Sequence, residues 1–178
     1  MILVAVGTQI PFDRLISAVD RWALTRGRTD VLAQIGESDY AATTVKTFDF
    51  VGLDKFRALQ ETCTALVSHA GMGSILTAME LGKPIVIMPR DHHRGEHRNG
   101  HQLATAKRFQ GVPGVYVAMD EAALVEQLDN LSSRSGAPVV DSKALTDFTD
   151  RLRDYLQHLG GAPRSSAIPA SRLVARSG

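Results

Sequence analysis

The chain has 178 residues, and its 20 basic and 19 acidic residues give a net charge of +1 at pH 7. This length favours one globular domain, and hydrophobic residues at 44% exclude a mostly disordered chain. The balanced charge gives no general attraction to a polyanion, so we expect no nucleic-acid partner. The single cysteine, Cys63, excludes an internal disulfide and favours a reducing compartment.

The first residues, Met1–Gly7, are apolar and carry no basic leader or small-residue cleavage site. They are therefore predicted to form the first strand and not a signal peptide. No apolar run approaches the ~20 residues that a helix needs to cross a bilayer. We expect membrane association only through a partner or a surface patch.

Short β-branched apolar runs alternate along the chain with longer segments of helical period. This alternation is typical of an α/β domain with a parallel sheet. The predicted strands are Ile2–Val6, Val31–Ile35, Thr44–Phe48, Ala65–Ser68, Ile85–Met88 and Val115–Val117. The predicted helices are Phe12–Arg26, Leu53–Glu61, Met72–Leu81, His97–Phe109, Glu121–Leu131 and Ser142–His158.

Local signals support these boundaries. Asp120 is a predicted N-cap, and Gly27 and Gly82 are predicted to end the first and third helices. Residues 160–178 are rich in Gly, Ala, Pro, Ser and Arg and have no apolar period. We therefore expect a domain of residues 1–159 followed by a mobile tail at 160–178.

The fourth predicted strand runs into a glycine-bearing turn that opens a helix. Gly71 and Gly73 allow a backbone to approach an anion, and the N–H groups and dipole of the first helical turn favour a phosphate there. Ser74 and His69 can each donate a further hydrogen bond. In the alternative interpretation, both glycines only relieve steric crowding in a tight turn.

This turn superficially resembles a dinucleotide-binding fingerprint, because Asp91 lies twenty positions after Gly71. However, the third glycine position is occupied by Leu76, and the turn follows the fourth strand instead of the first. A dinucleotide-dependent oxidoreductase is thus the less favoured class. No Lys-Ser or Lys-Thr pair follows the glycines as in a Walker phosphate-binding loop, which excludes that motif. The sequence also has no Gly-x-Ser-x-Gly segment, which argues against a hydrolase triad.

The loop after the fifth strand, residues 89–102, holds four of the six histidines. His93, His97 and His101 are spaced by four, as metal ligands on one helix face often are. There is no His-Glu-x-x-His arrangement, and Gly100 interrupts the segment, so we expect no metal site. Glu96, His97 and Asn99 suit the hydroxyl groups of a sugar, and the alternative is a solvated loop.

A weaker signal follows the first strand. Gly7 allows a sharp turn there, and Thr8 can hydrogen bond a phosphate or cap the first helix.

Four segments together closely resemble glycosyltransferase family 28 C-terminal-domain proteins, and within them the small subunits of split GT-B transferases. The similarity covers residues 1–157. The segments are Gly7-Thr8-Gln9-x-Pro11-Phe12-Asp13-Arg14-Leu15, Ser68-His69-Ala70-Gly71-Met72-Gly73-Ser74, Gly82-Lys83-Pro84 and Gly95-Glu96-His97-x-Asn99-x-His101-Gln102.

The resemblance implies a Rossmann-like parallel sheet of about six strands flanked by helices, equivalent to the C-terminal half of a GT-B transferase. It implies binding of a UDP-sugar of the GlcNAc or glucuronic acid class, inverting transfer, and no cofactor or metal. A membrane-anchored partner subunit would hold a polyprenyl-diphosphate-linked acceptor and supply the catalytic base. The chain would then be cytoplasmic, at the inner face of the membrane, and would tend to form homo-oligomers in isolation.

Residue roles carried over from this resemblance fall into three groups. Gly7, Thr8, His69, Gly71, Gly73 and Ser74 would contact the donor diphosphate. Related sequences carry a ribose-binding Glu where this chain has Thr77, and Glu80 is the other ribose candidate. Glu96, His97 and Asn99 would contact the sugar. The competing interpretation is a partner subunit that binds a nucleotide without catalysis.

Overall fold

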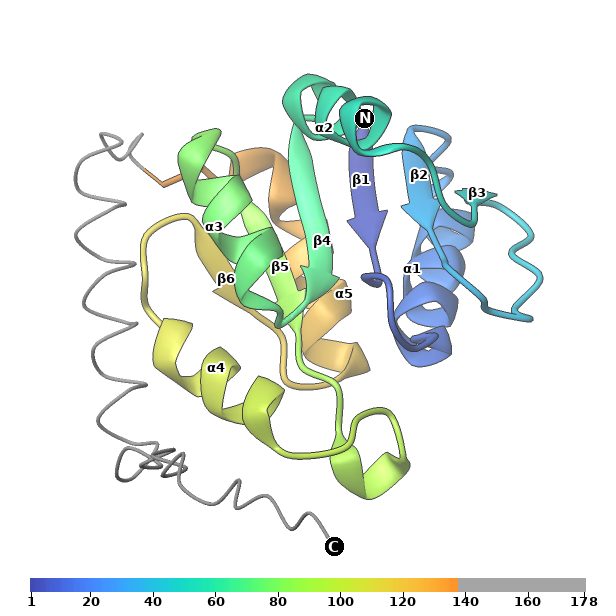
Figure 1. The fold of residues 1–178 in the computed structure, drawn as a ribbon. Helices are drawn as coiled ribbons and strands as arrows, with labels where there is room; N and C mark the ends of the chain where they lie inside the picture. Colours follow the sequence, from blue (N-terminus) through green and yellow to red (C-terminus); the bar gives the residue numbers. More distant parts are fainter. Residues whose placement is uncertain (138–178) are drawn as a thin grey trace, which may run out of the picture. The chain divides into compact units, whose positions relative to one another are not determined.

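The computed structural model describes residues 1–137, which form one six-stranded parallel sheet flanked by helices (Figure 1). The sheet order is β3-β2-β1-β4-β5-β6, and every neighbouring pair is parallel. The six predicted strands all form, so the predicted Rossmann-like fold is confirmed. Their bounds are β1 Ile2–Ala5, β2 Val31–Gln34, β3 Lys46–Phe48, β4 Ala65–His69, β5 Ile85–Met88 and β6 Val115–Val117.

Five helices lie along this sheet, at α1 Asp13–Arg26, α2 Leu53–Thr62, α3 Met72–Glu80, α4 His101–Phe109 and α5 Glu121–Asp129. α1 and α5 pack on one face, and α2, α3 and α4 pack on the other (Figure 1). The central strands therefore bury both of their faces, whereas the edge strand β3 exposes Lys46 and Thr47. In β5, for example, Ile85 and Ile87 face the α2–α4 side while Val86 and Met88 face the α1–α5 side.

Several predicted boundaries are confirmed. The Asp120 carboxylate accepts the Ala123 N–H at 2.8 Å at the start of α5. Gly27 after α1 and Gly82 after α3 both adopt left-handed backbone with φ +61°. The predicted end of α5 at Leu131 differs, because the helix ends at Asp129, before the short 3-10 helix Leu131–Ser133.

The predicted start of α4 is wrong, because the helix begins at His101 and not at His97. A 3-10 turn, His92–Arg94, ends at Gly95, and a loop separates it from the helix. The Asn99 carboxamide oxygen accepts the His101 N–H at 3.3 Å, which favours helix initiation after Asn99.

Three predictions lie outside the described residues: the helix Ser142–His158, the domain boundary at 159 and the tail at 160–178. Among residues 1–137, no helix combines the length and apolar character needed to cross a membrane.

Candidate functional site

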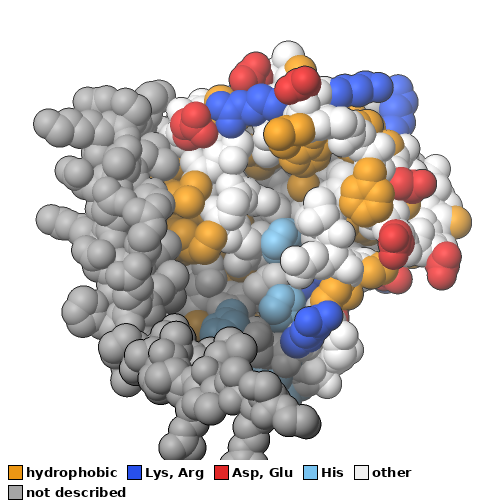
Figure 2. Space-filling model, viewed as in Figure 1, with side chains coloured by type: hydrophobic (Ala, Val, Ile, Leu, Met, Phe, Trp, Pro, Cys, Tyr) orange, Lys and Arg blue, Asp and Glu red, His pale blue; other side chains and the backbone are white. Residues whose placement is uncertain are grey.

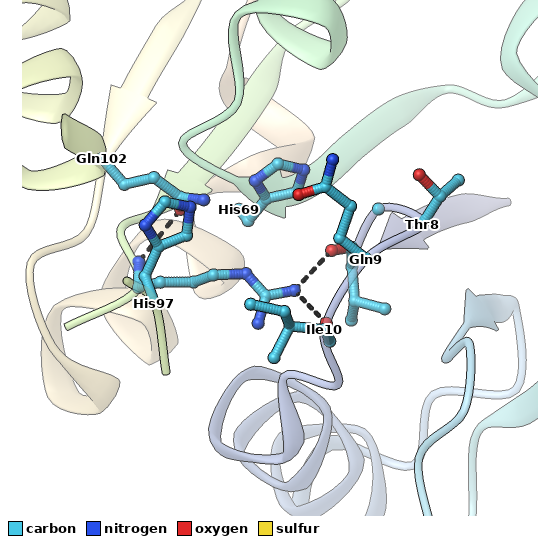
Figure 3. A pocket seen from close by; sticks show the side chains of 9 residues that line it. Thr8, Gln9, Ile10, His69, His97 and Gln102 are labelled. Atoms are coloured by element: carbon cyan, nitrogen blue, oxygen red, sulfur yellow. Dashed lines mark hydrogen bonds between the residues drawn. The ribbon is translucent and has the colours of Figure 1, made fainter. Parts of the chain in front are cut away.

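A pocket of 270 Å³ lies at the carboxyl edge of the sheet, where β1, β4 and β5 end. The sheet order reverses between β1 and β4, which is where open α/β sheets bind ligands. His97 and Gln102 lie across the pocket from Thr8, Gln9 and Ile10, with His69 between them (Figure 3). Val6, Gly7 and Arg90 complete the lining.

The imidazole of His69 is packed between two glycines. A Cβ atom on Gly71 would lie 2.2 Å from His69 Cε1, and one on Gly7 would lie 2.8 Å from Nε2. Gly7 also has φ +85°, a left-handed conformation that favours glycine. Both glycines therefore make room for His69, which spacing in the sequence alone did not reveal.

His69 is a neutral side chain at pH 7. Burial and the nearby positive charge of Arg90 lower its pKa to about 4. Its Nδ1 atom is buried without a hydrogen-bond partner among the described residues. The imidazole can therefore hydrogen bond a ligand, but it adds no positive charge to the pocket.

The N-terminus of α3 is open to an anion. Gly71 is the N-cap, no side chain caps the helix, and the first turn contains no acidic residue. A Cβ on Gly73 would meet no atom within 4 Å, so this side of the turn is uncrowded. The backbone N–H groups and the helix dipole can thus face a negatively charged ligand.

Ser74 sits beside this helix start, with its hydroxyl 3.1 Å from that of Ser68. Ser68 donates to the Ala5 carbonyl at 2.8 Å, so Ser74 acts as the donor between the two hydroxyls. To donate to a phosphate, the Ser74 hydroxyl must turn away from Ser68.

A second pocket of 240 Å³ is mostly apolar and shares Gly7 and Thr8 with the first. Phe50 and Leu53 in its wall are 48% and 83% exposed. Figure 2 shows hydrophobic side chains at the surface near histidines on the viewed face. The remaining lining residues are Ala5, Gln34, Val51, Phe56 and Ser74.

The sequence interpretation missed this apolar pocket. The available signal was the run Phe50-Val51-Gly52-Leu53, which places large apolar residues in a connection where polar residues are usual. A pocket with aromatic walls can hold a flat ring such as a nucleobase.

Glu96 lies outside the lining of both pockets and is held by other protein groups. Its carboxylate pairs with Arg14 at 2.6 and 2.8 Å and accepts the Asp91 N–H at 2.8 Å. Burial raises the pKa of Glu96, but the contacts with Arg14 and Asp91 outweigh it and hold the pKa below its usual range. Arg14 also donates to the Pro89 carbonyl at 3.0 Å, so this pair fixes the β5–α4 loop against α1.

The other predicted sugar residues differ in position. His97 lines the 270 Å³ pocket, and its Nδ1 lies 3.2 Å from the Asn99 carbonyl oxygen. Asn99 is exposed and lines neither pocket. The structure therefore brings His97 to the same pocket as Gly7, Thr8 and His69, but not Asn99.

The two ribose candidates line neither pocket. Glu80 is the last residue of α3 and pairs with Arg57 at 3.1 Å on the surface. Thr77 lies one helical turn after Gly73 and is partly buried. The ribose assignment stays a prediction.

The side chains that could bind a metal ion lie close together at a different place from the one that the histidine spacing suggested. His93 lies in the 3-10 turn, His97 in the loop and His101 in α4, so the three do not share one helix face. Asp91, His92 and His93 instead bring donor atoms within 4.8 Å of one another. None of these three residues lines the 270 Å³ pocket.

Arg90 is a pocket residue that the sequence interpretation missed. It follows β5, is only 3% exposed, and donates to the carbonyls of Pro11 and Val6 at 2.6 and 2.7 Å. Its guanidinium lies 4.7 Å from the centre of the Phe12 ring. Burial lowers the pKa of Arg90 to about 10, which leaves the group charged at neutral pH.

Solved structures with the same fold include glycosyltransferases. The NMR solution structure of ALG13 is 19% identical with a TM-score of 0.58, and the match covers 85% of this chain and 93% of ALG13. The glycotransferase of kitacinnamycin is 20% identical with a TM-score of 0.56 over 90% of this chain. UDP-GlcNAc 2-epimerase from Neisseria meningitidis, bound to UDP-GlcNAc, is 12% identical with a TM-score of 0.54 over 86%. The chain spans 40% and 44% of the last two proteins.

No curated protein matches the chain. The family model of the glycosyltransferase family 28 C-terminal domain matches residues 1–158. The fold agrees, since the Rossmann-like sheet matches the C-terminal half of a GT-B transferase. The chain therefore belongs to the glycosyltransferase family 28 C-terminal-domain family.

Proposed function

We propose that this chain is the donor-binding subunit of an inverting glycosyltransferase that uses a UDP-sugar of the GlcNAc or glucuronic acid class. The observation that carries the proposal is the open N-terminus of α3 beside two pockets that share Gly7 and Thr8. The 240 Å³ pocket is mostly apolar, whereas the 270 Å³ pocket has more polar side chains in its lining. A nucleotide-sugar combines parts of the same chemical kinds, with an aromatic base, a ribose, an anionic diphosphate and a sugar.

Each part of the donor finds suitable chemistry in this arrangement. The apolar pocket with Phe50 and Phe56 suits the uracil ring. The N–H groups at the start of α3 suit the diphosphate. The side chains of Gln102 and His97 in the 270 Å³ pocket suit sugar hydroxyls.

In the proposed reaction, an acceptor hydroxyl attacks the anomeric carbon while the bond to UDP breaks on the opposite face. Negative charge develops on the departing diphosphate. We expect the N–H groups at the start of α3 and the positive charge of Arg90 to stabilise that charge. The hydroxyl proton passes to a base that we place in a partner subunit.

The partner that we propose is a membrane-anchored subunit that holds a polyprenyl-diphosphate-linked acceptor in exopolysaccharide or lipid-linked glycan synthesis. It would keep this chain at the inner face of the membrane. Support comes from the similarity to ALG13, which extends over 93% of that protein. One half of a GT-B cleft cannot orient both donor and acceptor.

The test is transfer of labelled sugar to a lipid acceptor by this chain alone, by the partner alone and by their mixture. We expect transfer only from the mixture. Full transfer by this chain alone would contradict the two-subunit proposal. UDP binding without transfer by the mixture would favour a non-catalytic nucleotide-binding subunit.

A further inference from the structure

Arg90 places a positive charge in the wall of the 270 Å³ pocket. Its guanidinium nitrogens donate to four backbone carbonyls, those of Val6, Ile10, Pro11 and, at 3.5 Å, Glu96. Three of these acceptors lie between β1 and α1, so Arg90 fixes the segment that carries Gly7 and Thr8.

The charge of Arg90 is not neutralised by a direct ion pair with a described residue. The two carboxylates that act on it electrostatically, Glu96 and Asp13, have closer partners. Glu96 accepts hydrogen bonds from Nε and Nη2 of Arg14, and the Asp13 carboxylate accepts one from the Ser38 hydroxyl. Carbonyl dipoles solvate the guanidinium, but they do not cancel its net charge.

Two of the other nitrogen-bearing side chains of the pocket, those of His69 and Gln102, do not supply this charge. His69 is neutral at pH 7 because burial and Arg90 lower its pKa to about 4, and Gln102 carries no charge. A buried, uncancelled cation stabilises an anion strongly, since the surroundings screen it little.

We propose that Arg90 is the specificity-determining cation of this site: its charge, in the wall of the 270 Å³ pocket next to the start of α3, makes the site prefer a ligand with the charges of a diphosphate over the same ligand without them. The inference deepens the proposed function and rests on it. The hydrogen bonds of Arg90 position the β1–α1 segment, and its charge selects the ligand.

The test measures dissociation constants of UDP and of uridine by calorimetry on the full chain. The variants are Arg90→Met, which removes the positive charge, and Arg90→Lys, which keeps the charge but loses the planar guanidinium group. Arg26→Met is the matched control, because Arg26 lies on the surface of α1 and pairs with Asp129 at 2.7 Å. Circular dichroism and the thermal midpoint establish that each variant is folded.

We expect Arg90→Met to weaken UDP binding about tenfold or more, the loss typical of a charged contact, while uridine binding stays within about twofold. Arg90→Lys should keep the ratio of UDP to uridine affinity within about threefold even if the thermal midpoint falls. Arg26→Met should change neither affinity.

An equal loss of UDP and uridine affinity in Arg90→Met, or an unchanged UDP affinity, would overturn the inference. If Arg90→Met does not fold, Arg90→Lys decides, because loss of the UDP preference with the charge retained contradicts the proposal. A wild-type chain that binds neither ligand would instead contradict the proposed function itself.

Discussion

Two buried charges, Asp20 and Arg90, hold two loops at different places in the molecule. Asp20 is 2% exposed and accepts the backbone N–H groups of Thr43, Thr44 and Val45 at 2.9–3.0 Å. Arg90 is 3% exposed and donates to backbone carbonyls between β1 and α1. In both cases backbone dipoles take the place of an opposite charge.

The difference lies in what surrounds each group. Asp20 is enclosed by the segment before β3, with the Tyr40 and Thr43 hydroxyls completing its contacts at 3.2 and 3.1 Å. Arg90 lines the 270 Å³ pocket. The contacts of Asp20 hold the segment before β3, whereas the charge of Arg90 faces a pocket. Burial of a charge therefore does not by itself distinguish a structural role from a binding role.

The largest effect that we expect is on the structural side, from Asp20→Ala. Removing the carboxylate leaves several buried N–H groups without an acceptor, so the free energy of unfolding should fall by about 3 kcal/mol. Urea denaturation measures this change. Asp30→Ala is the control, because Asp30 forms a surface pair with Arg28 at 2.8 Å and should cost under about 1 kcal/mol. Equal losses in both variants would contradict a stabilising role for the buried Asp20 carboxylate.

Asp20 also predicts a dependence of stability on pH. Its buried hydrogen bonds outweigh the effect of burial and lower its pKa to about 2 from an ordinary 3.8. A lowered folded-state pKa adds stability above 3.8 that is lost as the pH falls through 2. The wild-type chain should lose about 2 kcal/mol more than Asp20→Asn between pH 5 and pH 2 in urea titrations. Parallel pH profiles for the two proteins would refute this assignment.

On the pocket side, Gly71→Ala should be more harmful than Gly73→Ala. A Cβ at position 71 would lie 2.2 Å from the His69 ring, whereas one at position 73 meets nothing within 4 Å. Overpacking should lower the free energy of unfolding by about 1–2 kcal/mol in Gly71→Ala only. Thermal unfolding of both variants tests this, and an equally stable Gly71→Ala would show that His69 is free to move.

A smaller effect is expected from Glu96→Gln. The change weakens the pair with Arg14 but leaves the pocket lining intact, so stability should fall by about 1 kcal/mol and UDP affinity should not change. Chemical denaturation and calorimetry separate these readouts. A lower affinity for the UDP-sugar with unchanged UDP affinity and stability would support the predicted sugar contact of Glu96.

Much of the fold could be predicted because its signals are local. Buried parallel strands appear as β-branched runs such as Ile85–Met88, and Asp120 marks the start of α5 through its own side chain. The predicted start of α4 was wrong because the polar residues from His97 to Gly100 are compatible with a helix or a loop.

The site was only partly predictable because its contacts are distant in sequence. The glycine turn at Gly71 was found from spacing, but the packing of His69 between Gly7 and Gly71 depends on two strands coming together. Arg90 was missed because a charge can be buried there only with carbonyls from Val6 to Pro11, some 80 positions earlier.

The central claim is that this site binds the nucleotide of a UDP-sugar, and thermal unfolding of the chain with UDP or with NAD tests it most directly. A ligand that binds only the folded state stabilises it by about 2.7 kcal/mol at about 100 times its Kd. We expect UDP to raise the thermal midpoint in proportion to the logarithm of its concentration and NAD to leave it unchanged. A rise with NAD and none with UDP would contradict the account.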